Sequence, residues 1–449
     1  MTTNSVQPAR GTRDFLPSEV RKREHVIGII RRVYEQYGFE PLETPAFENI
    51  DTLLGKYGEE GNKLIFKILR RGEHEASGEA DLALRYDLTV PLARVVAQYQ
   101  NELPKFFKRY QIQPVWRADR PARGRFREFY QCDVDAIGST SPVVEAEVIA
   151  AVSDVMGRLG FDDFVVRLNH RRALTALLEC AGIPGALHGE ALVALDKLDK
   201  IGPERVGSEL QARGVDAAAA AACLRFFAVD EGDARMRDPI DRLREFVAGH
   251  DAGQTAVGEL EEIMRLTGGT AAQGRIRIDP SLARGLSYYT GAIMEIAVPD
   301  LAGSLGGGGR YDNLIGMFLG RDVPACGFSL GLERIIVVMT ERKMFPASVA
   351  AGGADVMVTI WNDQTRGEAL ALASELRSAG LRVDVYPDAD KLGKQLKYAA
   401  SRTVPLVVVL GDDERARGEV AIKDLRTGEQ TTVARAGAAE FVANRLRTP

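Results

Sequence analysis

The sequence has few cysteines, and their spacing suits neither a metal site nor a disulfide framework. The 449 residues include only four, at positions 132, 180, 223 and 326, and no two are spaced as zinc ligands are. Disulfide frameworks are typical of small secreted domains, so free thiols in a reducing cytoplasm are the simplest interpretation. The five histidines are also dispersed and no HExxH occurs, so we expect no structural metal.

Long hydrophobic runs are also missing. The opening segment MTTNSVQPARGTRDF has no apolar core of signal-peptide length, and the runs IIVVM and LVVVL are far too short to span a bilayer. The four glycines at 306–309 are not followed by Gly-Lys-Ser/Thr, so they do not form a P-loop, and no dinucleotide-binding fingerprint occurs. We therefore expect a protein without membrane association that does not use the commonest nucleotide-binding loops.

The chain has no strong overall charge of either sign. Its formal net charge is −5, so a polyanionic partner has to be met by a local basic patch. One such patch lies at 105–127, where eight Lys or Arg residues stand against the single acid Asp119. Aromatic residues are interleaved with these cations, as at Phe106, Tyr110 and Trp116.

The length predicts two or three domains, because single cores stop growing at about 250–300 residues. Strands and helices do not alternate strictly in the first part, which favours an antiparallel or mixed sheet and an α+β fold. An Ala- and Leu-rich stretch then interrupts the strand-like segments and looks wholly helical. After the Ala-Gly junction 347–353, strands and helices alternate as in a small α/β domain. The expected parts are 1–180, 181–268, 269–345 and 354–449.

The segment 115–135 is the strongest candidate for a site. It reads VWRADRPARGRFREFYQCDVD, an arginine-rich loop between two strands. In the second strand Gln131, Asp133 and Asp135 share one face, because strand side chains alternate. Such a face could bind a cationic or amide-bearing ligand beside a polyanion, although a solvated hairpin face is the commoner outcome of polar alternation.

Two later segments also contain candidate site residues. In SLARGLSYYTG, Arg284 and two tyrosines lie between glycines, which allow close approach of a ligand or backbone. In PACGFSLGLERI, a buried strand runs into a helix whose first turn contains Arg334. A cation is disfavoured there by the helix dipole, so Arg334 needs an anionic partner. That partner could be Glu333 or another carboxylate, or a phosphate.

These segments together resemble a known family. Arg117 with Asp119, the arginine loop and GFSLGLERI are similar to motifs 2 and 3 of class II aminoacyl-tRNA synthetases, and the opening helix with Pro45 is similar to motif 1. The segments RGTRDFLP, RYDLTVP, REFYQCDVD, ARGLSYYTG and GGRYDNLIGMF resemble histidyl-tRNA synthetases in particular. The resemblance covers nearly the whole chain.

The resemblance implies a six- to seven-stranded antiparallel catalytic sheet with a helical insertion, a C-terminal anticodon-binding domain and a homodimer. It implies ATP-dependent activation of L-histidine and transfer to the cognate tRNA, with ATP entering as its Mg²⁺ complex. The implied histidine-binding residues are Asp87, Leu88, Thr89, Gln131, Asp135, Arg284, Tyr288 and Tyr289. The implied ATP-binding residues are Arg117 at the α-phosphate, Asp119 at the adenine amino group, Arg125, and Arg334 at the far phosphates. Arg284 and Arg117 are the catalytic candidates.

This assignment agrees with the chemistry, because joining a carboxylate to a phosphate brings two anions together and requires fixed cations. The sequence departs from the family pattern at Asp87, Asp119, Ser287 and Asn313. The alternative is a histidine-sensing regulatory paralogue of the same fold that charges no tRNA. A class II synthetase of another specificity and a non-enzymatic RNA-binding protein are further alternatives.

Overall fold

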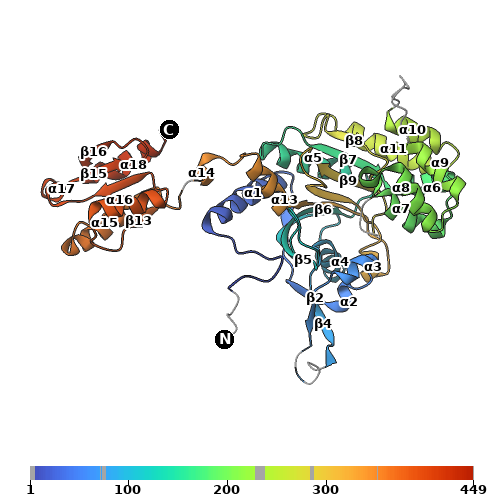
Figure 1. Cartoon of the computed structure of the whole chain (residues 1–449), viewed down its shortest axis with the longest axis horizontal. Helices are drawn as coiled ribbons and strands as arrows, with labels where there is room; N and C mark the ends of the chain where they lie inside the picture. The colour runs from blue at the N-terminus through green and yellow to red at the C-terminus, as the bar shows by residue number, and fades with distance from the viewer. Residues whose placement is uncertain are drawn as a thin grey trace. The chain divides into compact units, whose positions relative to one another are not determined.

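The computed structural model describes residues 6–70, 72, 77–227, 238–283, 288–350 and 352–447 (Figure 1). The chain divides into two compact units. The first comprises the residues up to Asp14 together with Arg23–Met344, and the second comprises Phe15–Lys22 together with the chain from Phe345 onward. In the described part of the chain, no helix is long and apolar enough to cross a membrane.

An eight-stranded sheet forms the centre of the first unit among the residues described, with the order β1-β5-β6-β11-β10-β9-β7-β8. The neighbouring pairs from β5 to β7 are antiparallel, and the two edge pairs β1–β5 and β7–β8 are parallel. The antiparallel sheet that the resemblance implied is confirmed, and the short edge strands extend it beyond seven strands. Its strands are β1 (Glu40–Pro41), β5 (Phe107–Trp116), β6 (Glu128–Ile137), β7 (Val165–His170), β8 (Ile276–Ile278), β9 (Ala292–Ala297), β10 (Gly306–Arg310) and β11 (Ala325–Gly331).

The two faces of β5 and β6 have different roles. Helix α1 (Pro17–Gln36) lies against one face, where the Tyr34 ring packs 6.1 Å from that of Tyr110 and its hydroxyl donates to the Cys132 carbonyl at 3.2 Å. Helices α5 (Val143–Arg158) and α13 (Leu332–Glu341) also pack on β6. The other face of β6 presents its polar side chains, Gln131, Asp133 and Asp135, and is the face on which a binding site can form.

The glycine run is a central strand rather than a turn. Strand β10 pairs with both β9 and β11. A Cβ on Gly308 would lie 2.1 Å from the Gly327 carbonyl oxygen, and one on Gly309 would lie 3.0 Å from the Tyr289 ring. Side chains are therefore excluded by the neighbouring strand and ring, and the strands approach each other closely here.

Residues 40–49 are divided between two sheets. Strand β1 joins the large sheet, whereas β2 (Phe47–Asn49) joins a three-stranded sheet with the order β2-β4-β3. Between them, the guanidinium of Arg85 donates to the carbonyls of Thr44 and Pro45 at 2.6 and 3.1 Å, which fixes the turn. Nearby elements are α2 (Ile50–Leu53), α3 (Gly58–Lys63), β3 (Lys67–Leu69), β4 (Ala80–Leu84), α4 (Thr89–Gln98) and α12 (Gly316–Leu319).

A helical region leaves the sheet after β7 and returns at β8, which is the hydrogen-bonded neighbour of β7. Figure 1 shows these helices grouped beside β7 and β9. They bury their own apolar residues, including Leu195, Val206 and Cys223. The helices are α6 (Arg171–Cys180), α7 (His188–Leu195), α8 (Leu198–Ala212), α9 (Ala217–Phe227), α10 (Pro239–Phe246) and α11 (Asp251–Leu266).

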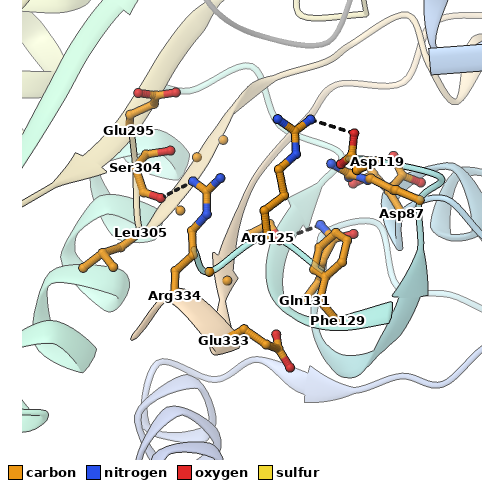
Figure 2. A pocket seen from close by; sticks show the side chains of 18 of the residues that line it. Asp87, Asp119, Arg125, Phe129, Gln131, Glu295, Ser304, Leu305, Glu333 and Arg334 are labelled. Atoms are coloured by element: carbon orange, nitrogen blue, oxygen red, sulfur yellow. Dashed lines mark hydrogen bonds and ion pairs between the residues drawn. The ribbon is translucent and has the colours of Figure 1, made fainter. Parts of the chain in front are cut away.

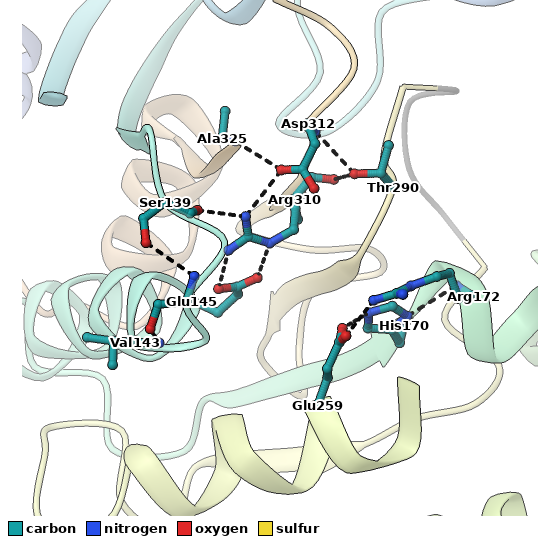
Figure 3. A network of polar contacts seen from close by, with 11 residues as sticks. Ser139, Val143, Glu145, His170, Arg172, Glu259, Thr290, Arg310, Asp312 and Ala325 are labelled. Atoms are coloured by element: carbon teal, nitrogen blue, oxygen red, sulfur yellow. Dashed lines mark hydrogen bonds and ion pairs between the residues drawn. The ribbon is translucent and has the colours of Figure 1, made fainter. Parts of the chain in front are cut away.

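Two polar networks connect the ends of strands to helices (Figure 3). At the end of β7, His170 Nε2 lies 2.8 Å from a carboxylate oxygen of Glu259 on α11, and its Nδ1 accepts from the backbone N–H of Arg172. At the end of β10, Arg310 makes a bidentate pair with Glu145 of α5 at 2.5 and 2.7 Å. These bonds fix the insertion and α5 relative to the sheet that carries the site.

The second unit has a five-stranded sheet, counted over its described residues, with the order β13-β12-β14-β15-β16. Strand β12 is parallel to both β13 and β14, and β15 and β16 are antiparallel. One face packs on α15 and α18 and the other on α16. The elements are α14 (Ala347–Ala350), β12 (Val356–Val358), α15 (Arg366–Ser378), β13 (Val383–Val385), α16 (Leu392–Ser401), β14 (Leu406–Val409), α17 (Asp412–Arg417), β15 (Glu419–Asp424), β16 (Gln430–Ala434) and α18 (Ala438–Arg447).

Candidate active site

A pocket of about 510 Å³ opens over the polar face of the large sheet (Figure 2). Its walls come from the turn before α4, the end of β5, the arginine loop, strands β6 and β10, and the start of α13. Nine of the residues proposed from the sequence line it, namely Asp87, Thr89, Arg117, Asp119, Arg125, Gln131, Tyr288, Tyr289 and Arg334. The structure therefore brings together residues that are more than 240 positions apart in the sequence.

One end of the pocket is rich in arginines, and each is fixed by a neighbour. Arg117 donates from Nε to the Tyr86 carbonyl at 3.0 Å and lies 4.2 Å from the Tyr86 ring centre. Arg125 is paired with Asp119 at 2.6 Å, and this hydrogen bond raises the pKa of Arg125. Guanidinium groups held in this way provide preorganised positive charge for an anionic ligand.

Arg334 completes the cationic end from the first turn of α13, as the sequence predicted. Its Nη1 donates to the Ser304 carbonyl at 2.5 Å (Figure 2). The neighbouring Glu333 pairs with Arg23 at 2.7 Å and accepts a hydrogen bond from the Tyr130 backbone N–H at 2.9 Å. Glu333 thus fixes α13 to α1 and β6, and Arg334 faces the pocket.

The same pocket also presents buried hydrogen-bond acceptors, from Asp87 and Gln131. One oxygen of Asp87 accepts from the Tyr57 hydroxyl at 2.9 Å and the Val90 backbone at 3.1 Å. The other oxygen of Asp87 is buried and has no hydrogen-bond partner among the described residues, and the same holds for the side-chain oxygen of Gln131. The Gln131 amide is oriented by donating to Ser329 Oγ at 2.7 Å. Two buried acceptors beside one another can bind donor groups of a ligand.

Further along the same strand lies a buried charged cluster, which joins Arg109 and Tyr311, two residues that the sequence-based site did not include, to the proposed Asp135. Arg109 is 0% exposed and its Nη2 lies 2.8 Å from Asp135 and 3.7 Å from Asp133. Asp135 also accepts a hydrogen bond from the hydroxyl of Tyr311. A Cβ on Gly327 would collide with this carboxylate, so the glycine makes the space that it occupies.

Burial sets the ionisation of this end. Loss of hydration raises the pKa of Asp87 and Asp135, and it raises that of Asp133 to about 7, although Arg109 opposes the shift at all three. Arg109 lies close to Asp135, yet the direction remains upward because desolvation is the larger effect. The charge of these three aspartates therefore depends on how deeply they are buried, whereas the arginines of the pocket stay protonated.

Three of the residues proposed from the sequence do not line the pocket in the described structure. Asp135 is only 2% exposed and is not among the lining residues, because Arg109 and Tyr311 contact its carboxylate further along the strand from Gln131. Leu88 is fully buried, and its carbonyl accepts from Arg109 at 3.4 Å. Arg284, in 284–287, lies outside the described residues.

The pocket also contains residues that the sequence-based site missed. Glu295 from β9 and Ser304 line it, as does Asp196 from the turn after α7. Strand alternation over 289–298 could have placed Glu295, but no local pattern indicated Asp196, which comes from the helical insertion. Within the described ranges, no group of three potential metal-ligating side chains occurs.

The antiparallel sheet, the arginine at the end of β5 and the arginine in the first turn of α13 define the catalytic domain of a class II aminoacyl-tRNA synthetase. Comparison with protein-family models matches residues 11–335 to histidyl-tRNA synthetase and residues 355–445 to the anticodon-binding domain. The chain belongs to the histidyl-tRNA synthetase family.

Individual relatives agree with this membership. The chain is 42% identical to the histidine–tRNA ligase of Gloeobacter violaceus, with 98% of each chain covered, and 42% identical to that of Porphyromonas gingivalis, with 97% and 98% covered. The crystal structure of histidyl-tRNA synthetase from Nostoc is similar with a TM-score of 0.82, at 32% identity over 99% of this chain and 100% of that one. A Bacillus halodurans structure described as an ATP phosphoribosyltransferase regulatory subunit/histidyl-tRNA synthetase shares the fold at 21% identity and a TM-score of 0.73, covering 92% of this chain and 100% of that chain.

Proposed function

We propose that this protein ligates L-histidine to its cognate tRNA in two steps. A carboxylate oxygen of histidine attacks the α-phosphorus of ATP, forming histidyl-adenylate and releasing pyrophosphate. A hydroxyl of the terminal adenosine of the tRNA then attacks the carbonyl carbon, forming the ester and releasing AMP. The observation that carries the proposal is a single pocket lined both by fixed arginines and by buried acceptors that have no hydrogen-bond partner among the described residues.

The arginines are assigned to ATP. Arg117 is placed at the α-phosphate, where negative charge develops in the first step, and Arg334 at the far phosphates. Arg125 and Asp119 hold the rest of the nucleotide, with Asp119 as an acceptor for the adenine amino group. ATP enters as its Mg²⁺ complex, so the metal is part of the substrate. Arg284 remains the second catalytic candidate, as an arginine near the α-phosphate and the substrate carboxylate.

The acceptor end is assigned to histidine. Imidazole and ammonium N–H groups need acceptors, and Asp87 and Gln131 offer buried oxygens with no other partner in the described structure. Thr89, Tyr288 and Tyr289 form the walls, and the two tyrosine rings pack edge to face with centroids 5.1 Å apart. We propose that Asp135 contributes through its contacts with Arg109 and Tyr311, and that Leu88 contributes through its backbone.

We assign residues 1–180 and 269–345 to the catalytic domain, 181–268 to the helical insertion and 354–449 to the anticodon-binding domain. We also propose a cytoplasmic homodimer. The edge strand β1 and the neighbouring groove, which includes Phe47 (51% exposed) and Tyr99 (40% exposed), support a second copy as the partner. Sedimentation equilibrium tests this, and a monomer at micromolar concentration would contradict it.

The activity is tested by ATP–pyrophosphate exchange with each of the twenty amino acids, followed by charging of total tRNA. We expect exchange with histidine only, and a histidine ester on one tRNA species. Exchange with another amino acid would indicate a different specificity. Histidine binding without exchange or charging would indicate the regulatory paralogue.

A further inference from the structure

The polar face of β6 continues onto the neighbouring strand β11. The two strands are antiparallel in a register that places Ser329 directly opposite Asp133, and Gln131 lies two residues before Asp133 on the same face. The β11 positions on either side of Ser329 on this face are Gly327 and Gly331. Over this stretch β11 therefore contributes one side chain to the face, the hydroxyl of Ser329, and this residue lines the pocket together with Gln131 (Figure 2).

The Ser329 hydroxyl lies between an amide and a carboxylate. Its oxygen accepts a hydrogen bond from Nε2 of Gln131 at 2.7 Å, so its own hydrogen has to point elsewhere. Oδ1 of Asp133 is buried and has no hydrogen-bond partner in the described part of the chain. Burial raises the pKa of Asp133, and the Ser329 hydroxyl opposes that rise, as a donor beside an ionised carboxylate does. The carboxylate is therefore the acceptor that the Ser329 hydrogen can reach.

The direction of these bonds decides how the Gln131 amide is turned. An amide has an accepting oxygen on one side and a donating nitrogen on the other, and a serine hydroxyl alone can bond to either. At about pH 8, above the pKa of about 7 that burial gives Asp133, the carboxylate is mainly ionised and can only accept. When it takes the Ser329 hydrogen, the Ser329 oxygen is left to accept from the Gln131 nitrogen. The Gln131 oxygen, buried and without a partner among the described residues, is then left for a ligand.

We propose that Ser329 is a positioning residue for histidine recognition, which takes its direction from Asp133 and holds the Gln131 amide with its oxygen toward an N–H group of the bound histidine. This inference rests on the proposed function of the protein and concerns the same pocket. Ser329 acts through Gln131. With the amide turned over, its nitrogen would meet the N–H groups of histidine, and two donors would be left facing each other without an acceptor.

Histidine-dependent pyrophosphate exchange in the full-length protein at about pH 8 tests the proposal, because Asp133 is mainly ionised there. Ser329→Ala should raise the KM for histidine roughly 3- to 10-fold, as loss of one neutral hydrogen bond does, while the KM for ATP stays within about twofold. The matched control is Ser153→Ala, which removes another buried hydroxyl, one that has no hydrogen-bond partner in the described structure. It should change neither KM.

A double-mutant cycle separates positioning from a change of pocket shape. Gln131→Glu replaces the amide with a carboxylate of similar shape that has an acceptor on both sides, so its orientation no longer matters. In this background Ser329→Ala should change the KM for histidine by less than about twofold. The cycle is repeated with Gln131→Ala, which has no amide to orient and for which the same result is expected, so the test does not depend on the folding of one variant.

Equal rises in the KM for histidine when Ser329→Ala is made in the wild type and in the Gln131 variants would overturn the proposal, because Ser329 would then act independently of Gln131. An unchanged KM for histidine in Ser329→Ala would overturn it as well. Both results leave the proposed function intact. A wild-type protein without histidine-dependent exchange would overturn the proposed function itself.

Discussion

The two ends of the catalytic pocket hold their charges in different ways. At the phosphate end, Arg125 keeps 52% of its side chain exposed and is always cationic. Beside the proposed histidine end, Asp133 and Asp135 do not line the pocket and are almost fully buried around Arg109, which has no exposed surface. The phosphate end can therefore lose a charge with little effect on folding. Around the buried aspartates, a change of charge should alter both the stability of the protein and the binding of histidine.

The largest effect is expected from Arg109→Leu. Removing this cation leaves two buried carboxylates without their partner, which should lower the free energy of unfolding by about 3–5 kcal/mol. Denaturant unfolding measures it. The matched control is Arg158→Leu, which removes an arginine from an exposed pair with Asp154 and should cost at most about 0.5 kcal/mol. Equal losses in the two variants would show that the buried cluster has no special role.

At the phosphate end, Arg117→Ala should slow histidine-dependent pyrophosphate exchange by about 10²–10³-fold, because one preorganised donor to the α-phosphate is lost. Stability should change little. Arg120→Ala in the same loop is the control, since Arg120 does not line the pocket and exchange needs no tRNA. If both variants exchange at the wild-type rate, the assignment of Arg117 to the α-phosphate is wrong.

The buried end should also be sensitive to pH. The pKa of Asp133 is about 7 in the folded protein, because burial raises it from 3.8. Between these values the folded protein keeps a proton that the unfolded chain has released, so stability is highest at the acidic end and falls as pH rises through about 7.

Asp133→Asn should remove this dependence. Between about pH 5.5 and about pH 8, the wild type should lose about 2 kcal/mol relative to the variant. Denaturant midpoints across the range provide the measurement, with Asp51→Asn on the exposed surface as the control. Parallel stability curves for wild type and Asp133→Asn would contradict a protonation change at this residue.

The sequence predicted the phosphate end better than the histidine end, for a physical reason. Arg117, Asp119 and Arg334 lie at a strand end, in a loop and at a helix start, and local pattern indicates such positions. Arg109 was missed although the sequence around it alternates in polarity. Its relation to Asp135 depends on the register of β5 against β6, which places the two residues opposite each other.

Other contacts had no local signal at all. Tyr311 reaches Asp135 over 176 positions of sequence, and Asp196 enters the pocket from the insertion. The fold class followed from the order of elements, whereas the split of 40–47 between two sheets depended on the Arg85 contacts with Thr44 and Pro45. Long-range contacts of this kind are decided by tertiary packing.

The central claim is that one pocket binds two substrates at chemically opposite ends, and steady-state exchange kinetics of Asp87→Asn and Arg334→Ala test it most directly. Asp87→Asn keeps an acceptor for Tyr57 but loses the anionic oxygen, so the KM for histidine should rise roughly tenfold or more while that for ATP stays within about twofold. Arg334→Ala should show the reverse, with the KM for ATP raised roughly tenfold. If each variant weakens both substrates equally, or if Asp87→Asn weakens only ATP, the division of the pocket is contradicted.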